Sequence, residues 1–336
     1  MLWNKNEPIA SSFCELQDIN IENCNKLRRM FPWSIVKSLA FLETLNIFDC
    51  ELLERIFETE KSSFATEEEE SGEIVFNSLT HLEFYNLPRL ACFYFGKCTL
   101  KFPCLNFLKI SRCHDMKTFS YGITNTPNLQ AIEIGENEVL VSSTKGINDI
   151  IQVFFTQEVS FPQMEYLYID RCNNLEMLWH NNGPINTSFT KLQTIRIEYC
   201  NKLKCVFPSN IVASLVCLED LYICSCELLE RVFEIAKPTF GDTKVLVPLR
   251  SLYLSRLPNL MYVWDKDAGD VLEFPNLKNV DVTSCSKLKS IFPASFTKYM
   301  KEIERLNVEE ENEIFPVDEA SNMGEVVRFQ SLETLA

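Results

Sequence analysis

The sequence predicts an α/β solenoid, in which short coils of chain stack on one another and a parallel β-sheet forms one wall. Two observations carry this prediction. The stretch CELLERIFE, which begins at Cys50, returns almost unchanged as CELLERVFE at Cys226. Within this long repeat a shorter pattern, L-x-x-L-x-I-x-x-C-x-x-L-x-x-I-F, recurs along the chain at spacings of mostly 24 to 31 residues. A segment repeated this often indicates a structural unit rather than a duplicated active site.

Each copy has the signature of one coil of a leucine-rich repeat. In the first copy, LQDINIE, Ile19 and Ile21 alternate with polar residues, as in a short strand with one buried face. Cys24 and Leu27 then turn inward and close the coil. One coil buries too few apolar side chains to offset the entropy of ordering its backbone, so the coils must stack.

The repeats predict a single domain, residues 1–336, of about 11 to 12 coils. The copies start at Leu16, Leu42, Leu79, Leu105, Leu129, Met164, Leu192, Leu218, Leu249, Leu277 and Ile303, and the chain ends inside a twelfth copy from Leu332. Two longer polar insertions, at 58–75 and 135–160, interrupt the pattern, and the repeat resumes after each. Because the chain ends inside the twelfth copy, it reads as a fragment or a truncated product.

The expected architecture is a horseshoe, with the parallel sheet on its concave face and irregular loops and short helices on its convex face. Three FP pairs are followed by short amphipathic stretches, such as SNIVASLVCL. We expect Ser34, Ser209 and Ser295 to cap short helices there.

Composition and charge exclude several classes of function. The formal net charge is -15, whereas nucleic-acid binding and attachment to acidic membrane surfaces need clustered cations. No stretch approaches 18 uninterrupted apolar residues, so no membrane span is expected. The N-terminal segment lacks the apolar core of a signal peptide.

Seven of the 14 cysteines occupy the same repeat position. They are Cys24, Cys50, Cys113, Cys172, Cys200, Cys226 and Cys285. We expect them to be buried, to behave as small apolar residues and to donate weakly to backbone carbonyls. Cys92, Cys98 and Cys104 lack metal-ligand spacing, and Cys224 is expected to face outward.

No catalytic, metal or cofactor site is predicted. The three histidines, His81, His114 and His180, fall in different repeats, and no nucleophile motif accompanies them. The acidic runs Glu67–Glu70 and Glu309–Glu311 read as solvated loops. Because no phosphate-binding G-x-x-x-x-G-K-[ST] motif occurs, the chain itself is not expected to bind ATP.

The concave face is where we expect function. Residues between the strand leucines point outward there, and Tyr166, Tyr168, Arg196, Tyr222 and Tyr253 should form one continuous patch. Tyrosine and arginine are enriched at binding hot spots, although strands favour aromatic residues in any case. This patch is the predicted protein-binding site.

The pattern L-x-x-L-x-I-x-x-C-x-K-L-x-x-[IV]-F-P, with LPRL at Leu87 and LPNL at Leu257, resembles the repeat region of plant nucleotide-binding leucine-rich-repeat disease-resistance proteins of the coiled-coil class. The resemblance implies an intracellular immune receptor. Its repeats would recognise a pathogen effector or a guarded host protein, and would restrain a nucleotide-binding domain. This chain has no coiled coil, no P-loop and no nucleotide-binding domain of its own.

We therefore expect a non-enzymatic protein-recognition module. The alternative is a substrate adaptor of an ubiquitin ligase, which would need an F-box before the first repeat. An enzyme site within the Gly135–Ser160 insertion is poorly supported, because that segment lacks a plausible acid–base or nucleophile set. The identity of the ligand, the contact surface and the oligomeric state are left open by the sequence.

Overall fold

The computed structural model has two compact units, Met1–Met164 and Glu165–Ala336. Each unit is a solenoid of stacked parallel strands, as predicted. The described residues are 13–58, 72–116, 118–135, 161–173, 175–179, 189–234, 245–264, 272–292, 296 and 302–308. Most of both predicted insertions, residues 59–71 and 136–160, lies outside them.

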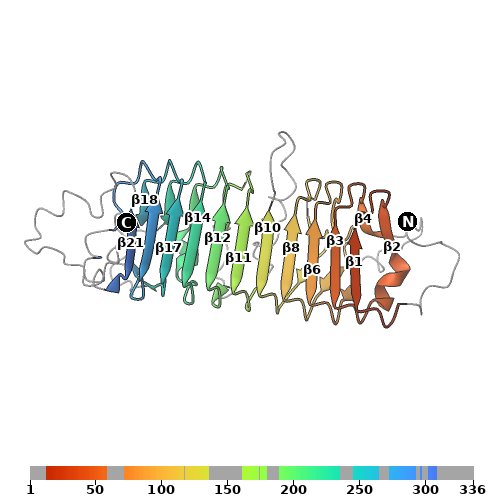
Figure 1. Cartoon of the computed structure of the whole chain (residues 1–336). Helices are drawn as coiled ribbons and strands as arrows, with labels where there is room; N and C mark the ends of the chain where they lie inside the picture. The colour runs from red at the N-terminus through yellow and green to blue at the C-terminus, as the bar shows by residue number, and fades with distance from the viewer. Residues whose placement is uncertain are drawn as a thin grey trace, which may run out of the picture. The chain divides into compact units, whose positions relative to one another are not determined.

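Parallel strands form the main sheet of the first unit, where they lie side by side (Figure 1). They are β1 (Asp18–Glu22), β3 (Thr44–Phe48), β6 (His81–Tyr85), β8 (Phe107–Ser111) and β10 (Ala131–Gly135). Equivalent repeat positions pair without a shift in register, so Asn20 lies opposite Asn46 and Glu83 opposite Lys109. Each strand is the x-L-x-I-x segment of one predicted copy, which confirms the predicted strand positions.

The second unit repeats this arrangement. Its main-sheet strands are β11 (Tyr166–Asp170), β12 (Thr194–Glu198), β14 (Asp220–Cys224), β17 (Ser251–Ser255), β20 (Asn279–Thr283) and β21 (Arg305–Val308). Along β14, Leu221 and Ile223 are buried while Asp220, Tyr222 and Cys224 are partly exposed. This alternation gives the sheet one apolar face and one accessible face.

Short extended segments form further sheets in both units. The first unit has β2 (Arg29–Pro32), β4 (Arg55–Glu58), β5 (Glu73–Val75), β7 (Thr99–Lys101) and β9 (Thr124–Asn125), and the second has β13 (Cys205–Phe207), β15 (Arg231–Phe233), β16 (Val245–Leu246), β18 (Tyr262–Trp264) and β19 (Leu272–Glu273). Several of these strands contain the [IV]-F pair of the repeat. Strands therefore occupy much of the region where we expected loops and helices.

Two short helices follow FP pairs, as predicted, but serine does not cap them. A 3-10 helix, η2 (Trp33–Ser38), and an α-helix, α2 (Ser209–Val212), begin directly after proline. Pro32 and Pro208 are the N-cap residues, and neither helix has a side-chain cap hydrogen bond. The capping predictions for Ser34 and Ser209 are wrong because both serines already lie inside the helix; Ser295 lies outside the described residues.

Aromatic side chains stack from coil to coil in the core. In the first unit the ring centroids of Phe57 and Phe93 are 5.3 Å apart, and those of Phe93 and Phe119 are 4.9 Å apart. In the second, Phe233 lies 5.0 Å from Phe207 and 5.5 Å from Trp264. Each ring is thus covered by rings of both neighbouring coils, which is the mutual burial that a single coil lacks.

In each of nine coils, the residue directly after the main-sheet strand has a left-handed backbone conformation, with φ between 51° and 56°. None of the nine is glycine; they are Asn23, Asp49, Asn86, Arg112, Arg171, Tyr199, Ser225, Arg256 and Ser284. The conformation costs an L-residue about 1–2 kcal/mol. In eight of the nine the N–H donates to the last strand residue of the next coil, as Arg171 does to Glu198 (2.8 Å) and Tyr199 does to Cys224 (2.9 Å). Stacking therefore holds the strained turn in place.

The repeated cysteine comes next, and its predicted role is confirmed in six coils. These thiols are buried and donate to the carbonyl two residues earlier, for example Cys50 to Phe48 (3.3 Å) and Cys200 to Glu198 (3.4 Å). Cys24 is only half-buried, so its predicted burial is wrong. It belongs to the first described coil, and no described coil covers the outer side of that coil.

Candidate functional site

The accessible sheet face of the second unit carries the predicted patch residues. Tyr168 on β11, Arg196 on β12, Tyr222 on β14 and Tyr253 on β17 are paired in strict register. They form one row across four strands. Tyr166 lies in the adjacent row, opposite Thr194. We call these five residues (Tyr166, Tyr168, Arg196, Tyr222 and Tyr253) the tyrosine–arginine patch.

Neighbouring side chains of the row contact one another. The rings of Tyr222 and Tyr253 are stacked, with centroids 4.6 Å apart and planes 6° from parallel. The guanidinium carbon of Arg196 lies 5.5 Å from the centre of the Tyr168 ring. This mutual packing restricts the conformations available to the side chains of the row.

A carboxylate orders one end of the row. Glu198 Oε1 accepts hydrogen bonds from Arg196 Nε (2.7 Å) and Nη2 (2.6 Å), and Oε2 accepts one from the Tyr168 hydroxyl (3.3 Å). The hydrogen bonds to Glu198 raise the pKa of Arg196. Burial and the charges of Asp170 and Glu198 raise the pKa of Tyr168 well above its usual range. Both groups therefore keep their protons at neutral pH.

Asp170 ends β11 on the same face and lies opposite Glu198. It is only 8% exposed. Burial raises the pKa of this carboxyl to about 6, the charge of Glu198 acts in the same direction, and Arg171 and Arg196 oppose the rise. The sequence assigned no role to Asp170, because an aspartate at the end of a strand is expected to be exposed. Its burial in the structure is what distinguishes it from the other carboxylates of this face.

The corresponding face of the first unit has a different chemistry. Lys109 Nζ lies 3.3 Å from both Glu83 and Glu133, and their charges raise the pKa of the lysine. His81 stacks on Phe107 with ring centroids 4.4 Å apart, and its Nε2 lies 4.0 Å from Glu83. In this row Lys109 bridges Glu83 and Glu133.

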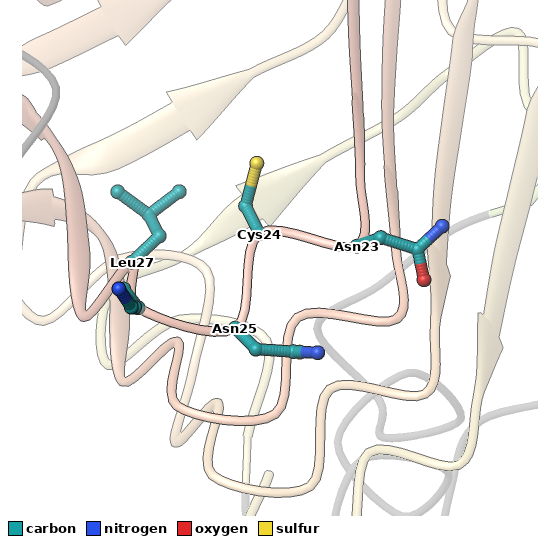
Figure 2. Close-up of a pocket in the computed structure, with 5 residues that line it drawn as sticks. Asn23, Cys24, Asn25 and Leu27 are labelled. Carbon is teal, nitrogen blue, oxygen red and sulfur yellow. The ribbon is translucent and has the colours of Figure 1, made fainter.

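A pocket of about 480 Å³ lies in the first coil. It is lined by Asn23, Cys24, Asn25, Lys26 and Leu27, at the turn that follows β1. Figure 2 shows the side chains of Cys24 and Leu27 pointing to one side, and those of Asn23 and Asn25 pointing away from them. The pocket offers amides, a thiol and an ammonium group that do not converge on one point, so it lacks an assembled nucleophile and base.

Metal and catalytic constellations are not assembled in the described ranges. Across those residues, no group of three or more His, Cys, Asp or Glu side chains is placed to hold a metal ion. His81 and His114 belong to different coils, while His180 and both acidic runs lie outside the described part of the chain. Cys92 and Cys98 are buried, Cys104 is exposed, and Cys224 is partly exposed as predicted. Over the described helices, none is long and apolar enough for a membrane span.

One family model matches most of the chain. The family model described as plant disease resistance protein RPS2-like, leucine-rich repeats, matches residues 1–138 and 163–312. The match is to a repeat module and not to an enzyme family. The search of curated proteins finds no match.

Two solved structures are similar at low identity. The leucine-rich repeat domain of the type III effector XopL is 15% identical, with a TM-score of 0.35, over 90% of this chain and 76% of that chain. The TLR13–ssRNA13 complex is 14% identical, with a TM-score of 0.17, over 87% of this chain and 62% of that chain.

Proposed function

Because this chain belongs to the RPS2-like leucine-rich-repeat family of plant disease-resistance proteins, we propose that it is the protein-recognition module of an intracellular immune receptor. Its ligand is a pathogen effector or a guarded host protein, and the same module restrains a nucleotide-binding domain. The location we propose is the cytoplasm. A role as an ubiquitin-ligase adaptor is not favoured, since the match is to resistance-protein repeats.

One observation carries the proposed binding surface: Tyr168, Arg196, Tyr222 and Tyr253 form an uninterrupted row across β11, β12, β14 and β17. Buried Tyr and Arg side chains dominate the energetics of protein interfaces because they combine a large apolar area with polar groups. The row is partly exposed and already packed, so a partner can cover it with little rearrangement.

The proposed mechanism is a shift between two states. The module binds the nucleotide-binding domain in the resting state, and a ligand that prefers the released module moves the equilibrium away from that complex. Such a ligand shifts the equilibrium only by its difference in affinity for the two states. The affinity of the module for the nucleotide-binding domain must therefore change when the ligand binds or when the bound nucleotide is exchanged.

The experiment measures binding of the full chain to the nucleotide-binding domain of a receptor of this family, loaded with ADP or with ATP. We expect measurable binding in one nucleotide state and at least about tenfold weaker binding in the other, a coupling of about 1.4 kcal/mol. Absence of binding in both states contradicts the regulatory part of the proposal.

A matched variant tests the patch. If the row contacts the bound protein, Tyr222→Ala with Tyr253→Ala should weaken binding by about 2 kcal/mol or more, which is about 30-fold in Kd. Tyr121→Ala is the control, because Tyr121 is exposed, stacks only on Phe95 among the described ring pairs and lies outside the sheet. Equal losses in patch and control variants would argue against a role for the patch.

A further inference from the structure

Two of the repeated cysteines lie against each other in the first two coils. Cys24 and Cys50 occupy the same position after the paired strands β1 and β3. The N–H of Asn23, directly before Cys24, donates to Phe48 O (3.1 Å). The side-chain Oδ1 of Asn25, directly after Cys24, accepts from the backbone N–H of the residue that follows Cys50 (3.2 Å). Contacts on both sides of the pair therefore hold the two cysteines in neighbouring coils at one register.

This register brings the two thiols within reach of each other. Neighbouring strands of a sheet lie about 4.8 Å apart, and a disulfide joins Cα atoms that are about 4.4–6.8 Å apart. The Cys50 thiol interacts with both the backbone and the thiol of Cys24, and it donates to Phe48 O (3.3 Å). A bond between the two sulfurs therefore requires rotation of side chains rather than movement of a coil.

One thiol of the pair is accessible and the other is not. Cys50 is fully buried, whereas Cys24 is half-buried and lines the pocket of about 480 Å³ together with Lys26. The other five repeated cysteines are buried. Figure 2 shows Cys24 pointing to the same side as Leu27, whose side chain belongs to the core. The Cys24 thiol therefore stands between the pocket and the buried thiol of Cys50.

We propose that Cys24 and Cys50 form a peroxide-sensitive dithiol, in which Cys24 is oxidised first and Cys50 then closes a disulfide between the first two coils. This inference goes beyond the proposed function and does not depend on it. Such a disulfide is transient in a reducing compartment, where protein disulfides are usually catalytic or redox-sensing.

The reaction has two balanced steps. The Cys24 sulfur attacks hydrogen peroxide, so that an S–O bond forms, the O–O bond breaks, and the released hydroxide takes the thiol proton as water. The Cys50 sulfur then attacks the Cys24 sulfenic acid, so that the S–S bond forms, the S–O bond breaks, and the Cys50 proton leaves in a second water. The two thiols together lose two electrons, and these electrons reduce one peroxide to two waters.

The order of the steps follows from burial. Susceptibility to peroxide increases with exposure and thiolate character, which favours Cys24 over Cys50. Burial raises the pKa of Cys50, so this group stays a thiol and is protected from direct oxidation. Once Cys24 is a sulfenic acid, the fixed position of Cys50 gives it an advantage over any thiol in solution.

Other cysteines of the chain separate access from proximity. Cys200 and Cys226 interact through their thiols as Cys24 and Cys50 do, but both are buried. Cys104 is exposed and is not one of the repeated cysteines. If access and proximity are both needed, Cys200 and Cys226 stay reduced, Cys104 stops at the sulfenic acid, and Cys24 and Cys50 form a disulfide.

The test treats the dilute, folded full chain with hydrogen peroxide, with and without dimedone to trap sulfenic acids, and maps every cysteine by peptide mass spectrometry. Peroxide is raised until Cys104 is modified. We expect a peptide that links Cys24 to Cys50 and has lost two hydrogen atoms. The proposal is overturned if Cys24 stays reduced, if it remains a sulfenic acid without a disulfide, or if Cys200 and Cys226 are linked in equal yield.

Variants assign the role of each thiol. Cys50→Ala should increase dimedone labelling of Cys24 at least about tenfold, because the sulfenic acid has lost the thiol that consumes it. Cys24→Ser should reduce oxidation of Cys50 at least about tenfold, because the accessible thiol is gone. Cys226→Ala is the matched control and should leave the yield of the Cys24–Cys50 disulfide unchanged. Oxidation of Cys50 that survives Cys24→Ser would overturn the proposed order, and the map of the unmodified chain decides the matter if a variant does not fold.

Discussion

The burial of Asp170 makes a direct prediction about stability. Its carboxyl has a pKa of about 6 in the folded protein, against an ordinary value of 3.8. Between these two values the folded protein binds more protons at this site than the unfolded chain does. The free energy of unfolding therefore falls as the pH rises from about 4 to about 6, and the penalty is fully present above the higher pKa.

The magnitude follows from the difference in pKa. A shift of one pKa unit corresponds to 1.36 kcal/mol, so a shift of about two units sets an upper bound of about 3 kcal/mol at pH 7. Asp170→Asn removes the charge and keeps a side chain of the same size. We expect the variant to be more stable than the unmodified chain by about 1–3 kcal/mol at pH 7, and by almost nothing at pH 4.

The assay is urea unfolding followed by tryptophan emission. Two buried tryptophans, Trp179 and Trp264, report on the second unit. Replacing Trp3 and Trp33 with Phe removes the other two sources of signal. The quantity of interest is the difference in unfolding free energy between the chains with and without Asp170→Asn, measured from pH 4 to pH 8.

Two results would refute this reasoning. A stability difference that stays constant from pH 4 to pH 8 would mean that Asp170 has an ordinary pKa in the folded protein. A loss of stability at pH 7 would mean that the charge of Asp170 is well satisfied. Glu227→Gln is the control and should stay within about 0.5 kcal/mol of the parent at every pH, as exposed substitutions usually do.

Three further predictions concern the coils themselves. Phe233→Ala should lower the free energy of unfolding by about 3–5 kcal/mol in the urea assay, because this fully buried ring contacts aromatic rings of both neighbouring coils; a loss below about 1 kcal/mol would contradict the stacked core. Ser284→Gly should raise stability by about 0.5–1 kcal/mol and Ser284→Val should lower it, because the residue has φ 55°; the opposite order in thermal melts would show that the turn is unstrained. In native thiol labelling followed by mass spectrometry, exposed Cys104 should react quickly, whereas Cys200 should react only on unfolding because burial raises its pKa well above the ordinary value. Fast labelling of Cys200 would contradict the register of the coils.

Strand positions were predictable because the pleat has a period of two. Once Leu45 and Ile47 are assigned to the core, Thr44, Asn46 and Phe48 must point to the other face, and the structure has this arrangement. The repeat itself fixes which residues become neighbours across strands. The row formed by Tyr168, Arg196, Tyr222 and Tyr253 therefore followed from alignment of the copies alone.

Other features were beyond the sequence for physical reasons. The left-handed turns fall on Arg112 and Tyr199, residue types that carry no preference for positive φ, and are held by hydrogen bonds to the next coil. The short strands built from [IV]-F pairs depend on pairing between coils, as when Phe207 lies opposite Phe233. The partial exposure of Cys24 reflects its place at the end of the described stack, which the repeat pattern cannot encode.

The exposed row and the buried carboxylate next to it contribute differently to stability. The patch side chains are partly exposed, so their substitution should have little effect on the core, whereas Asp170 is buried beside Glu198, Arg196, Arg171 and Tyr168. Asp170→Asn should therefore change the pH dependence of stability, and Tyr222→Ala should leave that dependence as it is in the parent chain.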